Sequence, residues 1–366
     1  MGCGKQLNGM RGTKILLASH VYFTDSGPVY GPVNVIKDYL EGKKRKYYLI
    51  EYPLTSKLPL IIKSFFETLN TIVKGISYKP DLFVGIDPLN ALAGIILKKL
   101  GFARKTVFYC VDYTPTRFKN NFLNAAYLRI DEFCAKNSDE VWNVSMRIVE
   151  LRKKQGVLGQ KIKFAPNSPS FFKCPRLPIE EIGRNKIVMV AGLTHSPVFD
   201  LVLASFKKVL EKLPKLCLSV IGTGAYQKKL VKKVMKMGLS ENIKFLGQLS
   251  NKDLLEEVSK SGLALAIYTF SKDYSWVYYG DSKKAREYLA CGTPVVITDV
   301  VGTSEDIKKY RAGIVIKPAI KELSQALTLL LTDNDSWLNC RKNAIRLAKD
   351  YDLEKILDKA FSSYEA

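Results

Sequence analysis

The sequence has few histidines, no paired cysteines of a metal-binding type and no apolar stretch long enough to cross a bilayer. The longest apolar stretch, residues 82–97, is interrupted by Asp87 and Pro88 and falls short of the roughly 20 residues that a spanning helix needs. The seven cysteines are scattered without a Cys-Xaa-Xaa-Cys pair, and only two histidines are present, which argues against structural zinc. The first twelve residues lack the apolar core of a signal peptide. We therefore expect reduced thiols, no metal site and a cytoplasmic location.

Acidic residues are too few to balance the basic ones. The chain has 57 Lys and Arg against 35 Asp and Glu, which gives a formal net charge of +22. The surplus implies an anionic partner such as a nucleotide, nucleic acid or acidic lipid. Residues 1–180 are the more basic half, with 28 basic and 14 acidic side chains. The length of 366 residues, 47% of them hydrophobic, predicts two globular domains and excludes a disordered or fibrous chain.

Short β-branched runs alternate with longer amphipathic segments along the chain. In the first half, strands are predicted at 14–19, 47–51, 81–85, 106–111, 140–143 and 162–165, with helices at 32–40, 58–75, 91–100 and 145–155. The proline-rich stretch 166–178 is the predicted linker, after which the alternation restarts at 186–191. This order predicts parallel sheets with helical crossovers. The predicted fold is α/β, with two Rossmann-like doubly wound domains facing across a cleft, because ligands bind at the carboxyl ends of such strands.

Residues 279–296 are the most informative segment. Asp281 or Ser282 can cap a helix that Gly292 ends. The first turn of this helix carries three cations that oppose its positive dipole end at about 0.3–1 kcal/mol each, namely Lys283, Lys284 and Arg286. Free amides and lysines at one place suit a diphosphate. Glu287 lies three residues after Lys284, on the same face, and can accept paired sugar hydroxyls. The alternative is a solvated, charged helix.

Residues 186–320 resemble a GT-B glycosyltransferase of the large family 4 type. The blocks that carry the resemblance are Leu218–Gly224, Asn242–Gly247, Glu287–Val296 and Gly302–Glu305. The resemblance implies that Glu287 holds the donor ribose, Lys284 holds the diphosphate and the loop after Gly247 holds the base. It also implies an acceptor-binding domain at 1–172, with a terminal helix at about 346–366 packing back on it, and a nucleotide-sugar-binding domain at 173–345.

The candidate site residues follow from the helix start and the resemblance together. The predicted catalytic residues are Asp112, as an acceptor-side hydroxyl orienter or base, and Lys284. A loop cap is the alternative role for Asp112. The glycines of the loop at 25–31 can bring amides close to the donor phosphate, although an ordinary strand-helix turn explains them too. The predicted donor-binding residues are Gly27, Gly31, Gly192, Gly222, Gly224, Gly247, Gly280, Asp281, Ser282, Lys284 and Glu287.

Three positions depart from the family pattern. Tyr279 stands where many members have a glutamate that contacts the transferred sugar, so Asp281 takes that role or the sugar differs. Val111 stands where many members have a histidine before the aspartate. The segment 192–200 lacks the usual Arg and Lys that grip the donor phosphates, which places more of that charge on Lys284. His20 and His195 both follow predicted strands, and neither is assigned a catalytic role.

The predicted function is a hexosyltransferase-like enzyme that moves a sugar from a nucleotide-diphosphate sugar to the hydroxyl of a glycan or lipid-linked acceptor, in polysaccharide or glycolipid synthesis. Retention of configuration follows from the resemblance alone. No cofactor is expected, and Lys284 with helix amides supports the leaving diphosphate. The alternatives are a nucleotide-sugar epimerase-like GT-B enzyme, a GT-B domain retained for assembly, and a basic nucleic-acid-binding protein. No nucleic-acid-binding module is recognisable, so a nucleic-acid partner is not expected.

Two segments of the first half interleave basic and aromatic residues. These segments are 58–66 and 117–130. Basic amphipathic surfaces of this kind bind anionic membranes, which would make the protein peripheral at the inner face of the membrane. A core helix with a solvated basic face is the alternative.

Overall fold

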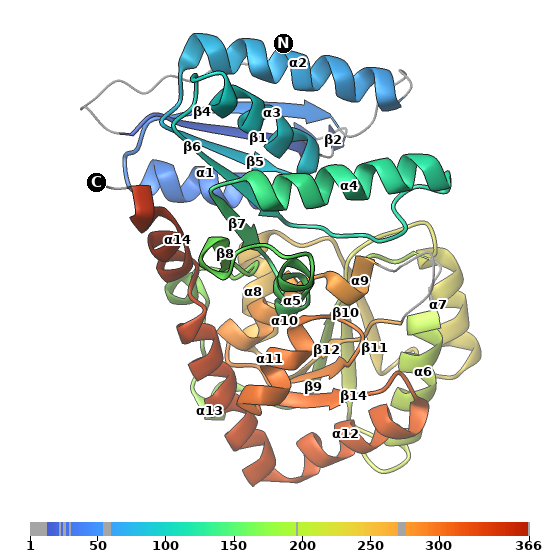
Figure 1. The fold of residues 1–366 in the computed structure, drawn as a ribbon. Helices are drawn as coiled ribbons and strands as arrows, with labels where there is room; N and C mark the ends of the chain where they lie inside the picture. Colours follow the sequence, from blue (N-terminus) through green and yellow to red (C-terminus); the bar gives the residue numbers. More distant parts are fainter. Residues whose placement is uncertain are drawn as a thin grey trace. The chain divides into compact units, whose positions relative to one another are not determined.

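The protein folds into two compact units, each built on a six-stranded parallel sheet (Figure 1). The computed structural model describes residues 13–21, 23–24, 27–28, 31–53, 60–194, 197–269 and 276–364. The first unit comprises residues 1–166 and 354–366, and the second unit comprises residues 167–353. The loop predicted at 25–31 and the position of His195 therefore lie partly or wholly outside the described residues.

The sheet of the first unit has the strand order β4-β1-β5-β6-β7-β8, with all neighbours parallel. Its strands are β1 (Ile15–Val21), β4 (Tyr47–Pro53), β5 (Leu82–Ile86), β6 (Lys105–Cys110), β7 (Glu140–Asn143) and β8 (Ile162–Phe164). Strand β1 pairs with the edge strand β4 on one side and with β5 on the other, so Ala18 lies between Ile50 and Gly85. A small antiparallel pair, β2 (Phe23–Thr24) and β3 (Gly27–Pro28), follows β1.

Helices flank this sheet, and the last helix of the chain belongs to the same unit. The helices are α1 (Pro32–Gly42), α2 (Leu60–Tyr78), α3 (Pro88–Lys99), α4 (Asn121–Asn137), α5 (Met146–Lys154) and α14 (Leu353–Phe361), with 3₁₀ turns at Gly159–Lys161 and Ser362–Tyr364. On α14, Phe361 is fully buried, stacks on Tyr39 and meets Trp142 edge to face. The end of the chain therefore completes the core of the first unit.

The sheet of the second unit has the order β11-β10-β9-β12-β13-β14, again with all neighbours parallel. Its strands are β9 (Gly183–Val190), β10 (Cys217–Ile221), β11 (Ile243–Gly247), β12 (Ser261–Ala266), β13 (Val295–Thr298) and β14 (Gly313–Ile316). Its helices are α6 (Pro197–Leu210), α7 (Gln227–Lys236), α8 (Asn251–Ser259), α9 (Trp276–Tyr279), α10 (Lys283–Ala290), α11 (Thr303–Tyr310), α12 (Ile320–Thr332) and α13 (Asn334–Asp350), with 3₁₀ turns at Phe171–Lys173 and Ile179–Glu181.

Strands β12 and β13 of the second sheet are buried along their whole length, which explains why they are nearly continuous apolar runs. Successive side chains of a strand point to opposite faces. In β9, Ile187 and Met189 join one hydrophobic cluster and Val188 joins the other. Helices α6 and α12 contribute to the first cluster, and α10 and α13 contribute to the second. Burial on two faces is the property that distinguishes parallel sheets covered by crossover helices from sheets with one wet face.

The predicted fold, two doubly wound α/β units, is confirmed. Helix bounds differ by a few residues from the sequence pattern, since α2 runs to Tyr78 instead of residue 75. In the part of the chain that the structure describes, no helix combines the length and the apolar character needed to cross a bilayer.

Candidate functional site

The helix α10 begins where the sequence predicts, at Ser282. The Ser282 hydroxyl accepts a hydrogen bond from the Ala285 amide at 3.1 Å and lies 2.7 Å from the Tyr268 hydroxyl. The Ser282 side chain is buried, so it caps the helix and is fully engaged there. At the other end, Gly292 adopts a positive φ of 72° after the last helical turn. Ser282 is thus the helix cap that the sequence offers, and its donor-binding role stays a prediction.

Asp281 does not present its carboxylate to a sugar, which corrects the prediction that it replaces the missing glutamate. Its side chain is 0% exposed. Its two oxygens share the single N–H of Arg286 Nε, at 2.8 and 2.9 Å, and the carboxylate also accepts one hydrogen bond each from Thr303 Oγ1 and the Asn167 amide at 2.8 Å. These partners occupy its lone pairs. Asp281 is therefore a positioning residue for the start of α10.

Arg286 is also buried and is not a free cation of the first helical turn. Its Nη2 lies 2.7 Å from Asp281 Oδ1 and 2.8 Å from Asp306 Oδ2. Two carboxylates compensate one guanidinium, so the predicted opposition between Arg286 and the helix dipole is removed by pairing. Of the three predicted first-turn cations, Lys283 and Lys284 are the two that are not enclosed in this way.

Lys284 is a half-buried cation without a hydrogen-bond or ion-pair partner among the described residues. Burial lowers the pKa of Lys284, and the charge of Glu287 partly offsets this. Burial likewise raises the pKa of Glu287 against the opposing effect of Lys283 and Lys284. The Nζ of the more exposed Lys283 lies 3.6 Å from Glu287 Oε1. The amide of Lys284 is in the first turn, where it has no acceptor inside the helix.

Three loops meet at the carboxyl ends of β9, β10 and β11, where four of the predicted glycines lie. The Gly222 amide donates to the Gly247 carbonyl at 2.7 Å, and the Leu193 amide donates to the Thr223 carbonyl at 2.9 Å. A Cβ on Gly222 would lie 2.0 Å from the Ala191 carbonyl oxygen, and one on Gly224 would lie 2.3 Å from that of Leu193. Close approach of backbones therefore requires glycine at these two positions.

The remaining predicted glycines have different surroundings. Gly192 has open space around its Cβ position, and Gly247 has a positive φ of 69°. The Gly280 carbonyl accepts from the Gly302 amide at 3.1 Å. In the first unit, Gly27 lies in β3, and the Gly31 amide donates to Asn34 Oδ1 at 2.8 Å at the start of α1. The Gly31 amide is thus engaged by its own helix and is not free for a phosphate, which corrects that prediction.

Asp112 lies in a loop of the first unit after β6. Its side chain is 47% exposed, and its carboxylate accepts from Arg117 Nη1 at 3.0 Å and from Thr114 Oγ1 at 3.3 Å. The contact with Thr114 is the local loop cap that the sequence offers as an alternative. Its exposure leaves oxygen surface for a substrate hydroxyl, so its catalytic role stays a prediction.

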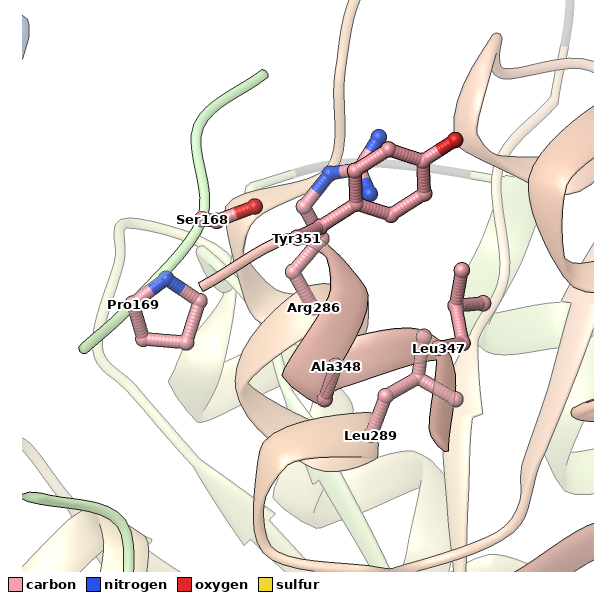
Figure 2. A pocket seen from close by; sticks show the side chains of 7 residues that line it. All are labelled: Ser168, Pro169, Arg286, Leu289, Leu347, Ala348 and Tyr351. Atoms are coloured by element: carbon pink, nitrogen blue, oxygen red, sulfur yellow. The ribbon is translucent and has the colours of Figure 1, made fainter. Parts of the chain in front are cut away.

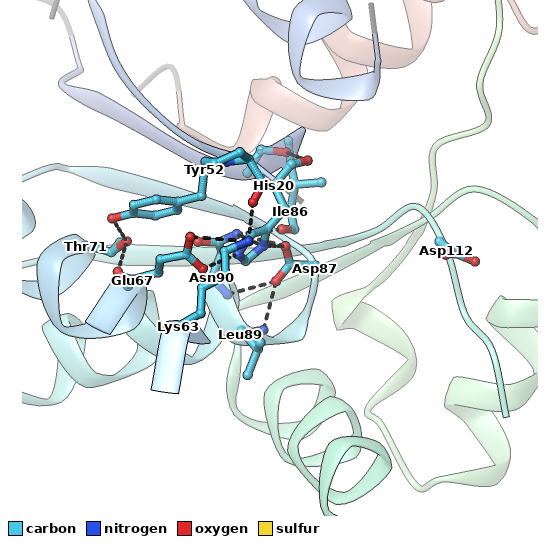
Figure 3. A network of polar contacts seen from close by, with 12 residues as sticks. His20, Tyr52, Lys63, Glu67, Thr71, Ile86, Asp87, Leu89, Asn90 and Asp112 are labelled. Carbon is cyan, nitrogen blue, oxygen red and sulfur yellow. Dashed lines mark hydrogen bonds and ion pairs between the residues drawn. The ribbon is translucent and has the colours of Figure 1, made fainter. Parts of the chain in front are cut away.

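A charged cluster in the first unit was not predicted from the sequence. His20 at the end of β1 lies between two carboxylates, with Nδ1 2.6 Å from Asp87 Oδ2 and Nε2 3.1 Å from Glu67 Oε2. Figure 3 shows the imidazole between the Glu67 side chain of α2 and the Asp87 side chain at the start of α3, with Asp112 apart from them. Asn90 Nδ2 reaches both Asp87 Oδ2 and His20 Nδ1. We call His20, Glu67, Asp87 and Asn90 the histidine cluster.

Electrostatics and backbone geometry set the histidine cluster apart. Burial lowers the pKa of His20, but the two carboxylates outweigh it and raise the pKa overall. Asp87 has a positive φ of 81°, which is rare for a residue other than glycine. Lys63 is buried nearby, 3.6 Å from Glu67 Oε1. Within the described ranges, no three His, Cys, Asp or Glu side chains are arranged to hold a metal ion.

A small cavity lies behind α10 in the second unit (Figure 2). Its volume is about 10 Å³, which is room for about one water molecule. The Arg286 guanidinium and the Tyr351 ring border it, 5.2 Å apart, together with mainly apolar side chains. The cavity is lined from α10 by Arg286 and Leu289 and from α13 by Leu347 and Ala348, and it is too small for a nucleotide.

Known structures share this fold across nearly the whole chain. Anabaena HepE, crystallised in complex with UDP, superposes with a TM-score of 0.72 at 16% identity and covers 96% of this chain and 100% of that chain. Sucrose-phosphate synthase from Thermosynechococcus elongatus also gives a TM-score of 0.72 at 16% identity, covering 96% of this chain and 98% of that chain. At these identities the likeness concerns the fold.

Sequence comparison points to the same class. MJ1059 of Methanocaldococcus jannaschii, described as an uncharacterized glycosyltransferase, is 24% identical over 382 residues, which is 89% of each chain. Residues 179–347 match the family model described as Glycosyl transferases group 1. The fold is therefore the GT-B fold of these structures, and the sequence match to Glycosyl transferases group 1 covers a little under half of the chain. The matched stretch lies within the second unit and contains α10, Lys284 and Glu287.

Proposed function

We propose that the protein transfers a sugar from a nucleoside diphosphate sugar to a hydroxyl acceptor, and that the start of α10 holds the donor. The observation that carries this proposal is Lys284, a half-buried cation that has no partner among the described residues and lies beside a first-turn amide. Glu287 offsets the desolvation of Lys284 only in part, and an anion that joins the cation would remove the remaining cost. A diphosphate supplies that anion, and the helix dipole attracts it to the same end.

Glu287 completes the donor site in this proposal. Its carboxylate accepts hydrogen bonds only, which suits the paired hydroxyls of a ribose. Burial raises its pKa while Lys283, 3.6 Å away, favours the ionised form. One helix face therefore presents a cation for the diphosphate and an acceptor for the pentose.

The reaction needs little covalent chemistry from the protein. The bond between the anomeric carbon and the diphosphate oxygen breaks, and its electron pair leaves with the nucleoside diphosphate. A bond from the acceptor oxygen to the anomeric carbon forms, and the hydroxyl proton is released. Lys284 and the amides at the start of α10 stabilise the charge that develops on the diphosphate. We infer retention of configuration and membership of the family 4 type from the sequence motifs around Glu287.

Uridine diphosphate sugars are the donors to test first. HepE of Anabaena has been crystallised with UDP and with UDP-glucose, at TM-scores of 0.72 and 0.71. In this proposal the loops after β9, β10 and β11 shape the donor site mainly through their backbone. The glycines of these loops are Gly192, Gly222, Gly224 and Gly247, and Gly280 lies between α9 and α10.

We assign the acceptor to the first unit, with Asp112 as a hydroxyl-orienting group, and expect a glycan or lipid-linked acceptor in polysaccharide or glycolipid synthesis. Helix α2 of this unit supports a peripheral contact with an anionic membrane at its inner face. Four apolar side chains spaced one turn apart on α2 are between 45% and 64% exposed, namely Ile61, Phe65, Leu69 and Val73. Such a stripe, in the more basic half of the chain, suits an anionic bilayer surface.

Donor binding is tested by calorimetry with UDP, UDP-glucose and the corresponding ADP and GDP compounds. Binding of a nucleoside diphosphate sugar raises the melting temperature by mass action and supports the proposal. Turnover of the bound donor is then compared with and without a hydroxyl acceptor. Conversion to a second nucleotide sugar without any acceptor would indicate an epimerase instead. Absence of binding to every compound would contradict the donor site.

A further inference from the structure

We propose that Glu67 of the histidine cluster binds and orients the hydroxyl of the acceptor, and that His20 and Asp87 position Glu67 for this task. The inference rests on the proposed glycosyl transfer and deepens it by naming an acceptor-binding residue. It concerns a carboxylate that no sequence motif indicates, because its neighbours come from distant parts of the chain.

The cluster lies at the edge of the sheet where doubly wound folds bind their ligands. His20 is the sixth residue of β1, and Asp87 directly follows β5. These two strands are neighbours in the sheet, so their carboxyl ends lie side by side. Lys63 donates to the carbonyl of Pro53, the last residue of β4, which pairs with β1 on its other side. Ligands of parallel sheets bind outside the carboxyl ends of the strands.

Hydrogen-bond capacity singles out Glu67 among the members of the cluster. The Asp87 carboxylate accepts four hydrogen bonds, from the amides of Leu89 and Asn90, from Asn90 Nδ2 and from His20 Nδ1. A carboxylate has about four acceptor sites, so Asp87 is saturated. Among the described residues, the Glu67 carboxylate has one hydrogen bond, from His20 Nε2, and one longer ion pair of 3.6 Å with Lys63. It retains capacity for a further donor, and a substrate hydroxyl is such a donor.

His20 sets the direction of the Glu67 side chain. Each ring nitrogen faces a carboxylate oxygen, with Nδ1 toward Asp87 and Nε2 toward Glu67. Asp87 holds the ring through Nδ1, so Nε2 points at Glu67. Lys63 Nζ lies 3.6 Å from the other oxygen of Glu67. Glu67 is thus a hydrogen-bond acceptor whose direction is set by His20 and Lys63.

The cluster is costly as a purely structural feature. Its imidazole and the Glu67 side chain are each 14% exposed, so the charges are largely removed from water. The positive φ of Asp87 adds backbone strain. Apolar residues in place of His20 and Glu67 would fill the same edge without the cost of removing charges from water. Binding of a polar substrate explains why charge and strain are kept at this edge.

The test uses the full chain with UDP-glucose as donor and two nucleophiles, water and excess glycerol. Glu67→Gln is expected to slow both glycerol glucosylation and hydrolysis by about 100-fold, because the attacking oxygen loses its orienting group. UDP-glucose affinity, measured by calorimetry, is expected to remain that of the wild type. Asp139→Asn is the matched control, since Asp139 is a half-buried carboxylate of the same unit, paired with Lys98 at 2.6 Å at the amino end of β7. It should lower the melting temperature without changing turnover.

Wild-type turnover by a folded Glu67→Gln variant would overturn the inference while leaving the donor proposal intact. If Glu67→Gln does not fold, Glu67→Asp replaces it, because aspartate keeps the charge but withdraws the carboxylate by one methylene. This variant should then favour water over glycerol, and an unchanged ratio of the two products would overturn the inference. If the wild type binds no nucleoside diphosphate sugar, the proposed function itself fails, and the inference fails with it.

Discussion

Arg286 Nε donates a bifurcated hydrogen bond to the two carboxylate oxygens of Asp281, at 2.8 and 2.9 Å, and so joins the residue before the helix cap to α10 itself. Asp306 of α11 pairs with the same guanidinium at 2.8 Å. The start of α10 is thereby fixed by a buried ion network, while Lys284 two residues earlier remains available. Fixed backbone and an available cation are the conditions under which a helix start binds an anion selectively.

Removal of one partner of this network should destabilise the protein strongly. Asp281→Ala leaves the buried Arg286 with one carboxylate, and we expect the free energy of unfolding to fall by about 3–5 kcal/mol. Urea denaturation measures this loss. Glu256→Ala breaks an exposed pair of 3.9 Å with Lys260 and is expected to cost about 0–1 kcal/mol. Equal small losses for both variants would contradict the structural role of Asp281.

Loss of Lys284 should weaken donor binding without weakening the fold. We expect Lys284→Ala to reduce UDP-glucose affinity by about 1.5–3 kcal/mol, the range for a hydrogen bond to a charged group. The matched control is Lys252→Ala, because Lys252 occupies the same second position of a serine-capped helix, α8, and is exposed. Calorimetry on both variants gives the comparison. If the Lys284→Ala and Lys252→Ala variants bind UDP-glucose with equal affinity, the diphosphate does not bind at Lys284.

Glu287→Ala should show a different specificity. The variant is expected to lose affinity for UDP-glucose and UDP, yet to bind pyrophosphate as the wild type does, since Glu287 is assigned to the ribose and not to the phosphates. Calorimetry with UDP, pyrophosphate and UDP-glucose in competition separates the contribution of the ribose contact from that of the phosphate contacts. A loss of pyrophosphate binding equal to that of UDP would argue against a ribose contact.

His20 should make stability depend on pH. Its pKa is raised above 6.5 in the folded state by Asp87 and Glu67, which outweigh the effect of burial. A group whose folded pKa exceeds its unfolded pKa contributes stability below the unfolded value, and this contribution is lost as the pH rises through the folded value. The ring is contacted by Glu67, Asp87 and Asn90. Lys63 lies next to Glu67. Urea denaturation from pH 6 upward should show the decline, and His20→Gln should remove it.

Helix α2 gives a prediction for membrane contact. The wild type is expected to float with vesicles that contain anionic lipid at low salt, and the double substitution Phe65→Ser with Phe66→Ser should abolish flotation. Both rings are exposed, by 64% and 58%, so the fold should tolerate the change. Leu329→Ser on α12, at 45% exposure, is the control for general loss of surface hydrophobicity. If the wild type floats with neither neutral nor anionic vesicles, the membrane contact is excluded.

The sequence predicts the fold well because each element carries its own periodic pattern. The strand expected at 81–85 is β5 at Leu82–Ile86, and the helix expected after Asp281 or Ser282 begins at Lys283. Buried parallel strands are continuous apolar runs, and crossover helices have one apolar stripe. These local signals do not depend on distant partners.

Side-chain roles are harder to predict because distant residues decide them. Lys284 and Arg286 look alike in the sequence, but Asp306, twenty residues later, pairs with Arg286 alone. His20 acquires its role from Glu67 and Asp87, which are 47 and 67 residues away and are brought to it by the strand order β4-β1-β5 and by α2. The aspartate before proline at the start of α3 was the one local signal that marked this edge.

The loops at the carboxyl ends of β9 and β10 differ in how much change they can accept during evolution. Gly222 and Gly224 are held against the carbonyls of Ala191 and Leu193, so almost any larger residue there would force the two loops apart. Gly192 lies between Ala191 and Leu193, and a Cβ at this position would face open space. Of these three glycines, Gly192 is therefore the one at which a side chain can be added without forcing the neighbouring backbone to move.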